Sequence, residues 1–191
     1  MVVGPARPRG RLSALVTALA LAAAAPPAFA QRPALRVYGV ADGLKYAQSF
    51  CVVPDGEGAI WVGTSYGVSR YDGKAFASLT ARDGLPHDSV HALAAGSGGT
   101  VWAGTQEGLA RIGADSGPLG EPRVVPLPPA LGPFGARRPS ALAARGDVLW
   151  LADGRRVARF HEGALRESLL PDGAGEVRGL LPTGDDACVV L

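Results

Sequence analysis

Three tryptophans divide the chain at nearly regular intervals. Trp61, Trp102 and Trp150 are spaced by 41 and 48 residues, and each is followed nine residues later by an arginine. Residues 60–64 (IWVGT) return almost unchanged as residues 101–105 (VWAGT). Sequence periods of about 20–50 residues are typical of solenoids and propellers. The repeat therefore restricts the chain to architectures that place one small unit beside the next several times.

The hydrophobic rhythm within one unit is that of short strands. Apolar runs at residues 49–53, 59–64, 68–71 and 75–80 are separated by turns rich in Asp and Gly. Four strands in about 41 residues are typical of one blade of a β-propeller. We therefore expect an all-β chain, a β-propeller with about three complete four-stranded blades and the start of a fourth. The expected blade repeats cover about residues 37–80, 81–125, 126–170 and, in part, 171–191.

The fourth unit begins but does not finish. A shift of 87 residues from the second unit places Val90 on Val177 and Trp102 on Val189, two residues before the last one, Leu191. Propellers close with about four to eight blades. We therefore expect an incomplete ring, the N-terminal piece of a longer protein whose remaining C-terminal blades are missing here. The alternative is a complete short protein that closes its ring by dimerising.

Several positions recur with the period and are interpreted as structural. Both faces of residues 60–64 are apolar, so we expect this strand to be buried between neighbouring blades. In a strand, residues two apart share one face, so Trp61 and Gly63 are expected to face the same neighbour, the indole to pack and the glycine to let another backbone approach. The arginines are expected to hydrogen bond to neighbouring turns. The structural repeat positions are Trp61, Gly63, Thr64, Gly67, Arg70, Trp102, Gly104, Thr105, Gly108, Arg111, Trp150 and Arg159.

The first thirty residues have the pattern of a secretory signal peptide. Three arginines precede an uncharged apolar stretch, and Ala28-Phe29-Ala30 supplies the small-x-small pattern before a cut expected after Ala30. We expect residues 31–191 to be the mature propeller region, periplasmic or secreted, with a retained N-terminal anchor as the alternative. Residues 31–191 carry 16 basic and 17 acidic residues, with no basic stripe for nucleic acid and no further run long enough to span a membrane.

The repeat offers little catalytic or metal-binding chemistry. His87 and His91 lie on a loop-to-strand segment and His161 lies at a turn, so we interpret all three as surface residues. We expect no catalytic residue, no metal site and no cofactor. Cys51 and Cys188 are far apart and belong to no C-x-x-C pair; both are interpreted as buried free thiols, although an exported protein permits a disulfide.

One segment breaks the repeat. The third unit is lengthened by a Pro- and Gly-rich insertion at residues 115–138 that ends in Arg137-Arg138. Loops on one face of a propeller often carry ligand contacts. The insertion is therefore either a ligand-contacting loop or a loosely held Pro-rich excursion.

These residues together resemble the two-component regulator propeller repeat. The likeness rests on the entry Asp83-Gly84-Leu85, on Asp55 and Gly58 of the first turn, and on residues 60–64 and 67–73. It covers residues 37–112 well and is weaker in the third unit, where residues 149–153 stand for the Trp-x-Gly-Thr core.

The resemblance implies a function. Such repeats form the periplasmic sensing region of membrane-bound histidine kinases and of some diguanylate cyclases, so we expect a non-catalytic sensor or interaction module whose output domain lies outside this chain. Its partner would be a small molecule, a polysaccharide or a protein. The family is also similar in architecture to streptogramin lyase, whose His–Glu pair cannot be placed on these residues. The alternatives are therefore part of a propeller lyase or hydrolase, and a stand-alone secreted binding scaffold.

Overall fold

The computed structural model describes residues 35–113, 121–134, 136–172, 175–184 and 188–191. The expected signal peptide at residues 1–30 and its cleavage point lie outside these residues. The chain divides into two compact units, Met1–Arg36 and Val37–Leu191, and the description below concerns the second. Among the described residues, no helix combines the length and the apolar character needed to cross a bilayer.

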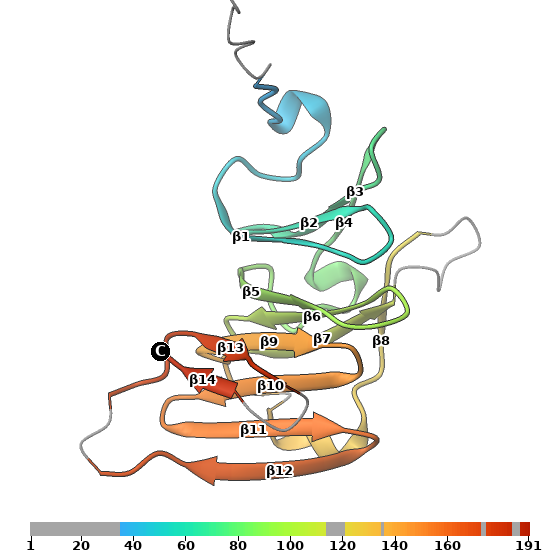
Figure 1. The fold of residues 1–191 in the computed structure, drawn as a ribbon. Helices are drawn as coiled ribbons and strands as arrows, with labels where there is room; N and C mark the ends of the chain where they lie inside the picture. Colours follow the sequence, from blue (N-terminus) through green and yellow to red (C-terminus); the bar gives the residue numbers. More distant parts are fainter. Residues whose placement is uncertain (1–34, 114–120, 135, 173–174, 185–187) are drawn as a thin grey trace, which may run out of the picture. The chain divides into compact units, whose positions relative to one another are not determined.

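Every strand of the described chain belongs to a small antiparallel sheet (Figure 1). Three sheets have four strands each, in the orders β1-β2-β3-β4, β5-β6-β7-β8 and β9-β10-β11-β12, and β13 and β14 form a two-stranded fourth sheet. The strands are β1 (Ser49–Pro54), β2 (Ile60–Thr64), β3 (Gly67–Tyr71), β4 (Phe76–Leu79), β5 (Val90–Ala95), β6 (Thr100–Thr105), β7 (Gly108–Gly113), β8 (Arg123–Val125), β9 (Ala141–Arg145), β10 (Val148–Asp153), β11 (Arg156–His161), β12 (Ala164–Leu169), β13 (Leu180–Pro182) and β14 (Cys188–Val190). The expected all-β propeller fold is confirmed, and its sheets do not close into a ring.

We call the three four-stranded sheets blades 1, 2 and 3. Their strand registers repeat, since Trp61 pairs with Arg70 in blade 1, and the next two tryptophans likewise pair with the arginines nine residues later. The first strands of blades 1 and 2 also share an irregularity, at Ser49–Cys51 and at Val90–Ala92. Residues that repeat in the sequence thus also occupy equivalent positions in the strand pairing of each blade.

The Asp-Gly-Leu triplet that begins each of the first two repeats builds a short turn. Residues Ala81–Asp83 form a 3-10 turn, η2, and the Asp83 carboxylate accepts hydrogen bonds from both the backbone N–H and the hydroxyl of Thr80, each at 2.8 Å. Gly84 follows at φ +104°, where a side chain would be strained, and Leu85 is buried. The first copy, η1 (Val40–Asp42), has the same turn, with a buried Leu44. Each residue of the triplet therefore has its own structural task.

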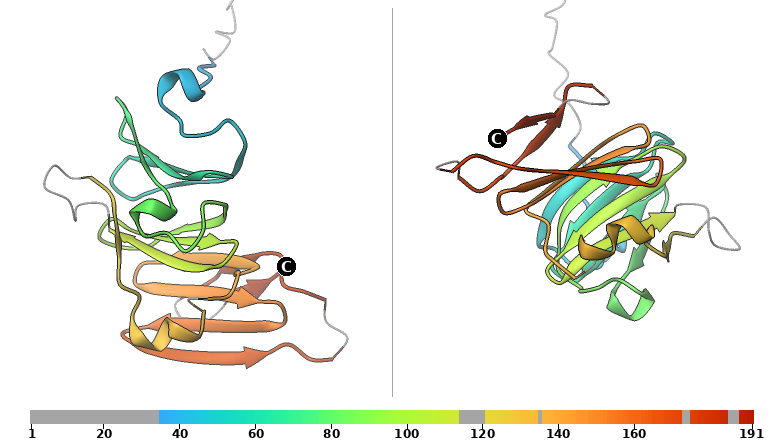
Figure 2. Two further views of the ribbon diagram at one scale, coloured as in Figure 1. Left: turned by 180° about the vertical axis from the view of Figure 1, so that it is seen from behind. Right: turned by 90° about the horizontal axis from the view of Figure 1, so that it is seen from below.

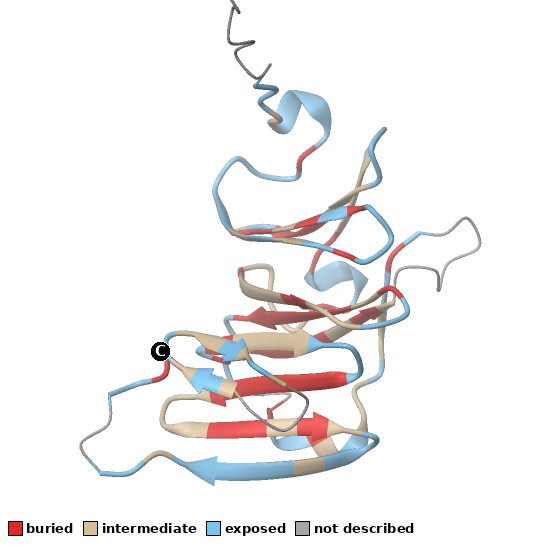
Figure 3. Ribbon diagram, viewed as in Figure 1, coloured by how far each residue is buried: buried red, intermediate tan, exposed pale blue. Residues whose placement is uncertain are grey.

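The core consists of layers between neighbouring blades. Trp61 packs with Val90 and Val101 of blade 2, and Trp102 packs with Leu149 and other residues of blade 3. Trp150 packs with residues that lead into and form β13 and β14, including the buried Val177. Each indole thus faces the following sheet. Figure 3 shows the result, with β10 buried along most of its length and β12 mostly exposed.

One expectation about the central strand needs correction in blade 1. Both faces of residues 60–64 are apolar and were expected to be buried between blades. The Trp61 side chain is fully buried, but Ile60 on the opposite face is 43% exposed, and Val52 beside it is 62% exposed. The physical reason is that blade 1 packs against a blade on one face only, whereas β6 and β10 have neighbours on both.

The described part of the insertion is built into the fold. Residues Arg123–Val125 form β8, the outer strand of blade 2. The following 3-10 segment η3 (Pro129–Phe134) buries Leu131 and Phe134 in the apolar layer beside blade 3 (Figure 2). Arg137 then forms an ion pair with Asp153 at 3.2 Å. A loosely held excursion does not describe these residues; residues 115–120 and 135 of the insertion lie outside the described chain.

The start of the expected fourth unit forms β13 and β14. Leu181 pairs with Val189 as Ala94 pairs with Trp102, which is the register that a shift of 87 residues predicts. Cys188 on β14 and Cys51 on β1 are both free thiols and half-buried.

Cys51 should react slowly with alkylating reagents. Burial of its side chain raises the pKa of the thiol to about 11, from an ordinary value of 9.0. Because the thiolate is the nucleophile, iodoacetamide at about pH 8 should modify Cys51 roughly a hundredfold more slowly in the folded than in the unfolded chain. The measurement is a mass-spectrometric time course on a Cys188→Ser variant, with the same reaction in guanidinium chloride as the control. Equal rates in the two conditions would contradict the burial.

Candidate functional site

The repeated threonine and glycine build the turn between the second and third strands of blades 1 and 2. The Thr64 hydroxyl donates to the Gly67 carbonyl at 2.9 Å and accepts from the Tyr66 N–H at 3.0 Å. Thr105 repeats the first bond with Gly108 at 2.8 Å. Gly67 has φ +109°, and a Cβ there would lie 2.2 Å from the Leu79 carbonyl oxygen. The threonine and the glycine therefore stabilise the turn, and neither offers a free side-chain group to a ligand.

The glycines of the central strands lie where the next blade comes closest. A Cβ on Gly63 would lie 2.5 Å from Cys51 Sγ and 3.0 Å from the Val90 carbonyl oxygen. A Cβ on Gly104 would lie 2.9 Å from a ring carbon of Pro139, just before blade 3. Both glycines thus lie at a contact with the next blade; the nearest atoms include backbone at Gly63, whereas at Gly104 they are side chains.

The three repeated arginines have different surroundings. Arg70 Nε lies 3.9 Å from the carboxylate of Asp55, and that carboxylate also accepts the indole N–H of Trp61 at 2.9 Å. Arg111 lies over the ring of Trp102, 5.8 Å from its centroid, and Arg159 lies over that of Trp150 at 5.9 Å. The sequence expectation missed Asp55 as the centre of this arrangement. Its place six residues before Trp61 was the available signal.

Blade 3 lacks the threonine–glycine turn of the other two blades. In the strand pairing, Asp153 stands where Thr64 and Thr105 stand, and Arg156 stands where their partner glycines stand. Asp153 Oδ2 accepts from Arg156 at 3.1 Å and from Arg137, at the end of the insertion, at 3.2 Å. The hydroxyl of the other blades bonds only within its own turn, whereas the Asp153 carboxylate binds two guanidinium groups from separate segments.

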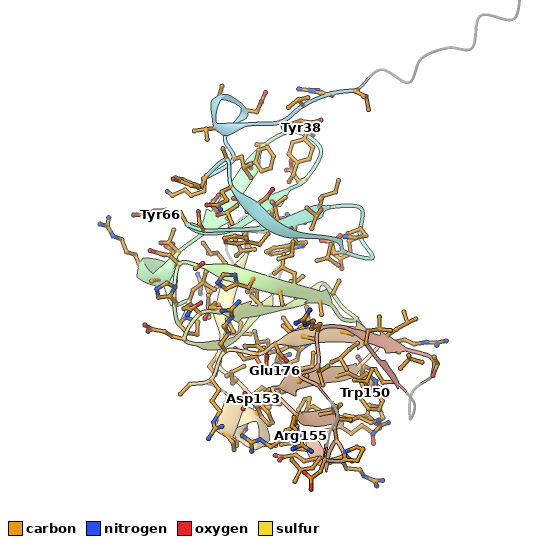
Figure 4. The ribbon with its side chains drawn as sticks, turned by 90° about the vertical axis from the view of Figure 1, so that its left-hand side faces the viewer. Tyr38, Tyr66, Trp150, Asp153, Arg155 and Glu176 are labelled. Carbon is orange, nitrogen blue, oxygen red and sulfur yellow. The ribbon has the colours of Figure 1, made fainter. Side chains whose placement is uncertain are left out.

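A hollow of about 480 Å³, which we call the polar hollow, lies beside this turn. Asp153 and Glu176 both line it, and Figure 4 shows them at the same edge of blade 3. Its floor is backbone that is already hydrogen bonded, since Ser140 N donates to Ala152 O at 2.8 Å and Val177 N donates to Gly154 O at 3.1 Å. The lining residues are Arg138, Ser140, Asp153, Gly154, Glu176, Val177 and Arg178.

The residues that line the polar hollow carry balanced charges. Arg138 and Arg178 supply two positive charges, and Asp153 and Glu176 supply two negative ones. Opposite charges and a hydroxyl around one concave surface provide donors and acceptors for a polar ligand without favouring a strongly charged one.

His91 lies on β5, the first strand of blade 2. His91 Nε2 is 3.0 Å from the Ser89 hydroxyl, and its ring lies 4.7 Å from that of Phe50 in blade 1. Burial, then the positive charge of Arg138, lowers the pKa of His91 below its ordinary value of 6.5. A neutral imidazole stacked on an aromatic ring is a packing arrangement. In the described part of the chain, no group of three or more His, Cys, Asp or Glu side chains could hold a metal ion.

No family model matches the chain, and no curated protein sequence matches it either. Solved structures do. The extracellular domain of a hybrid two-component system of B. thetaiotaomicron has a TM-score of 0.61 at 15% identity over 81% of this chain, and that of a one-component system of the same organism has 0.59 at 19% over 78%. Virginiamycin B lyase from Staphylococcus aureus, in a catalytically inactive form with quinupristin, has 0.58 at 22% over 78%.

The chain spans only part of each of these proteins. It covers 23% of the hybrid two-component domain, 20% of the one-component domain and 50% of the lyase. At such identities the likeness establishes the fold, and a shared ligand or activity does not follow from it. The chain therefore has the fold of a β-propeller segment of the kind found in extracellular sensor domains and in a propeller lyase.

Proposed function

We propose that this chain is the sensing region of an exported signal-transduction protein and that the polar hollow is where it binds a small polar molecule. The observation that carries the proposal is the replacement of the repeated turn threonine by Asp153, beside a concave surface of balanced charge. A ligand-binding site in a repeat protein is expected where one repeat differs from the others. Here the residue that differs, Asp153, lines the polar hollow. The fold shared with extracellular sensor domains supports the same function.

The ligand class follows from the lining. Two guanidinium groups can donate to hydroxyl or carboxylate oxygens, and two carboxylates can accept from hydroxyl or ammonium groups. The polar hollow therefore suits a neutral polyhydroxylated or zwitterionic molecule, such as a sugar or an amino acid. A strongly anionic ligand would meet Asp153 and Glu176.

The variant Asp153→Thr tests this proposal because it restores the residue of the other two blades and should keep the turn. The chain is screened by thermal shift against mono- and disaccharides and the common amino acids, and the strongest ligand is then titrated by calorimetry. We expect D153T to lose at least about tenfold in affinity, the size of one charge-assisted hydrogen bond. An equal affinity in both proteins, or no ligand in the whole panel, would overturn the assignment of the site.

A second candidate function is lyase activity, which the likeness to virginiamycin B lyase favours. The test is incubation of the chain with quinupristin, the compound that accompanies the lyase in its crystal structure, and a changed mass of quinupristin would establish lyase activity. If the chain belongs to a sensor, the mass and chromatographic retention of quinupristin stay unchanged.

The proposal also gives a place to the exposed apolar face of blade 1. Val52 and Ile60 are both exposed on β1 and β2, on the face opposite Trp61, and a further blade of the same ring would cover them. Export is tested separately with an alkaline phosphatase fusion after residue 191, which is active only outside the bacterial cytoplasm. A matched fusion that lacks residues 2–30 should be inactive.

A further inference from the structure

A second hollow, of about 310 Å³, lies between blades 2 and 3 at the hairpins β5–β6, β9–β10 and β11–β12. We call it the aromatic hollow, because its walls include the rings of Trp102 and Phe160, whose centroids are 6.3 Å apart. Arg111 and Pro128 also line it. None of its lining residues belongs to the polar hollow.

In blade 1 the corresponding place is filled by the chain itself. The side chain of Asp55 is only 1% exposed, and one of its oxygens accepts the indole N–H of Trp61 and lies 3.9 Å from Arg70 Nε. The other oxygen accepts two backbone N–H groups, of Glu57 at 3.0 Å and Ala59 at 2.8 Å. A buried carboxylate thus accepts the indole N–H of this repeat and supplies the opposite charge for its guanidinium, although Arg70 Nε itself has no hydrogen-bond partner within the described part of the chain.

In blade 2 the carboxylate is missing. Gly96 occupies the position of Asp55, as the backbone shows: Asp55 N donates to Ala59 O at 2.9 Å, and Gly96 N donates to Thr100 O at 2.8 Å. A Cβ on Gly96 would lie 3.6 Å from Trp102 Nε1, an ordinary van der Waals distance. Blade 2 therefore keeps the indole N–H and the space beside it, but it lacks the carboxylate that accepts this N–H in blade 1.

The positive charge is also retained without a neutralising partner. Among the described residues, no carboxylate lies within ion-pair distance of Arg111, and its buried Nε has no hydrogen-bond partner. Buried donors of a charged group are costly when they are left unpaired. The guanidinium instead lies over the ring of Trp102. This place in blade 2 thus has the donors of a carboxylate site and an open space where the carboxylate of blade 1 would be.

We propose that the aromatic hollow binds a small monocarboxylate with an apolar body. Its carboxylate occupies the place that Asp55 fills in blade 1, accepting from Trp102 Nε1 and from Arg111, and its apolar body lies against Phe160 and Pro128. Apolar and aromatic walls with a few well-placed polar or charged groups are typical of small-molecule sites.

The rim of the aromatic hollow sets the charge that it accepts. Asp147 and Glu162 lie there, both exposed, and a second carboxylate on the ligand would meet them. Glu162 has φ +49° and is the one non-glycine residue of the described chain with a positive φ. With Gly163 at φ +80° it forms the two-residue hairpin turn between β11 and β12, which requires positive φ at both residues and holds Glu162 at the rim. Monocarboxylates should therefore bind better than dicarboxylates.

The indole N–H of Trp102 gives a direct readout. The three tryptophans of the chain supply three indole signals in a ¹⁵N–¹H spectrum, each assigned with a Trp→Phe variant. Titration with sodium phenylacetate at constant ionic strength should move the Trp102 signal in a saturable way and leave the Trp61 signal in place. The neutral isostere 2-phenylethanol and the dicarboxylate succinate should bind at least about tenfold more weakly, because each lacks or mismatches one charge interaction.

Gly96→Asp is the decisive variant. Its carboxylate should fill the site from within, abolish phenylacetate binding and leave the spectrum folded, whereas Gly96→Ala should still bind, since it adds no acceptor. Asp153→Thr, which alters the polar hollow, should bind phenylacetate as the natural chain does, so the two sites fail independently. An unmoved Trp102 signal, an equal response to 2-phenylethanol, or undiminished binding by G96D would each overturn the proposal.

Discussion

Replacement of Asp55 by alanine should destabilise the chain by about 3–5 kcal/mol, the range for removal of one partner from a buried charged network. Three donors lose their acceptor: the N–H groups of Glu57 and Ala59 and the indole N–H of Trp61. Arg70 also loses the carboxylate that lies 3.9 Å from its Nε. Since Trp61 is fully buried, water cannot replace the lost acceptor without opening the layer between blades 1 and 2.

Asp72→Ala is the matched control for this variant. Asp72 also accepts two backbone N–H bonds in a turn, from Lys74 and Ala75, both at 2.8 Å, but it is exposed at the hairpin between β3 and β4. Water can replace that acceptor, so its loss should cost no more than about 1 kcal/mol. Urea unfolding followed by tryptophan fluorescence measures both. Similar midpoints for the two variants would show that Asp55 does not support the blade in the way described.

Gly67→Ala should be nearly as damaging, at about 3 kcal/mol or more, because strain and a steric clash add up at one residue. Its φ of +109° disfavours any side chain, and the new Cβ would lie 2.2 Å from the Leu79 carbonyl oxygen. The obstacle is backbone of the neighbouring strand β4, so no side-chain rotation can relieve it. Gly67 N also donates to Asp88 O at 2.6 Å, and a shift of the turn would lengthen that bond.

Gly73→Ala separates the two contributions. Gly73 has a similar φ of +95°, but a Cβ there would have no heavy atom within 4 Å. Its substitution should cost about 1 kcal/mol from backbone conformation alone. The difference between the two variants in a thermal or urea unfolding curve is then the price of the clash. Equal losses would mean that the loop absorbs the new methyl group.

The repeat in the sequence was sufficient for the fold. The spacing of the tryptophans predicts the blades, and the apolar runs predict the strands of blade 1 to within a residue or two at each end. The fourth unit could be placed in the correct strand register by a shift of 87 residues, because register is inherited from the repeat. Local patterns of this kind repeat in sequence because they repeat in structure.

The candidate sites were harder to predict, for a physical reason. Asp153 reads in the sequence as one more Asp-Gly turn, and Gly96 reads as part of a Gly-rich turn that connects two strands. Their meaning appears only when each is compared with its counterpart in another blade, together with the side chains that gather around it. Arg137 reaches Asp153 from 16 residues away, and the aromatic hollow joins hairpins of two blades. Such contacts depend on how the blades pack, which the period does not record.

The packing of each tryptophan against the following blade, rather than the preceding one, has an evolutionary consequence. Each of the three tryptophans packs against the sheet that follows it in the chain. Every unit therefore contributes the indole to one blade contact, and the next unit contributes the surface that the indole packs on. Duplication or loss of one whole unit by recombination would therefore bring compatible surfaces together. Blade number can drift in the descendants of such a gene, while a single altered turn, such as the one at Asp153, can acquire a new specificity without disturbing the blade contacts on either side.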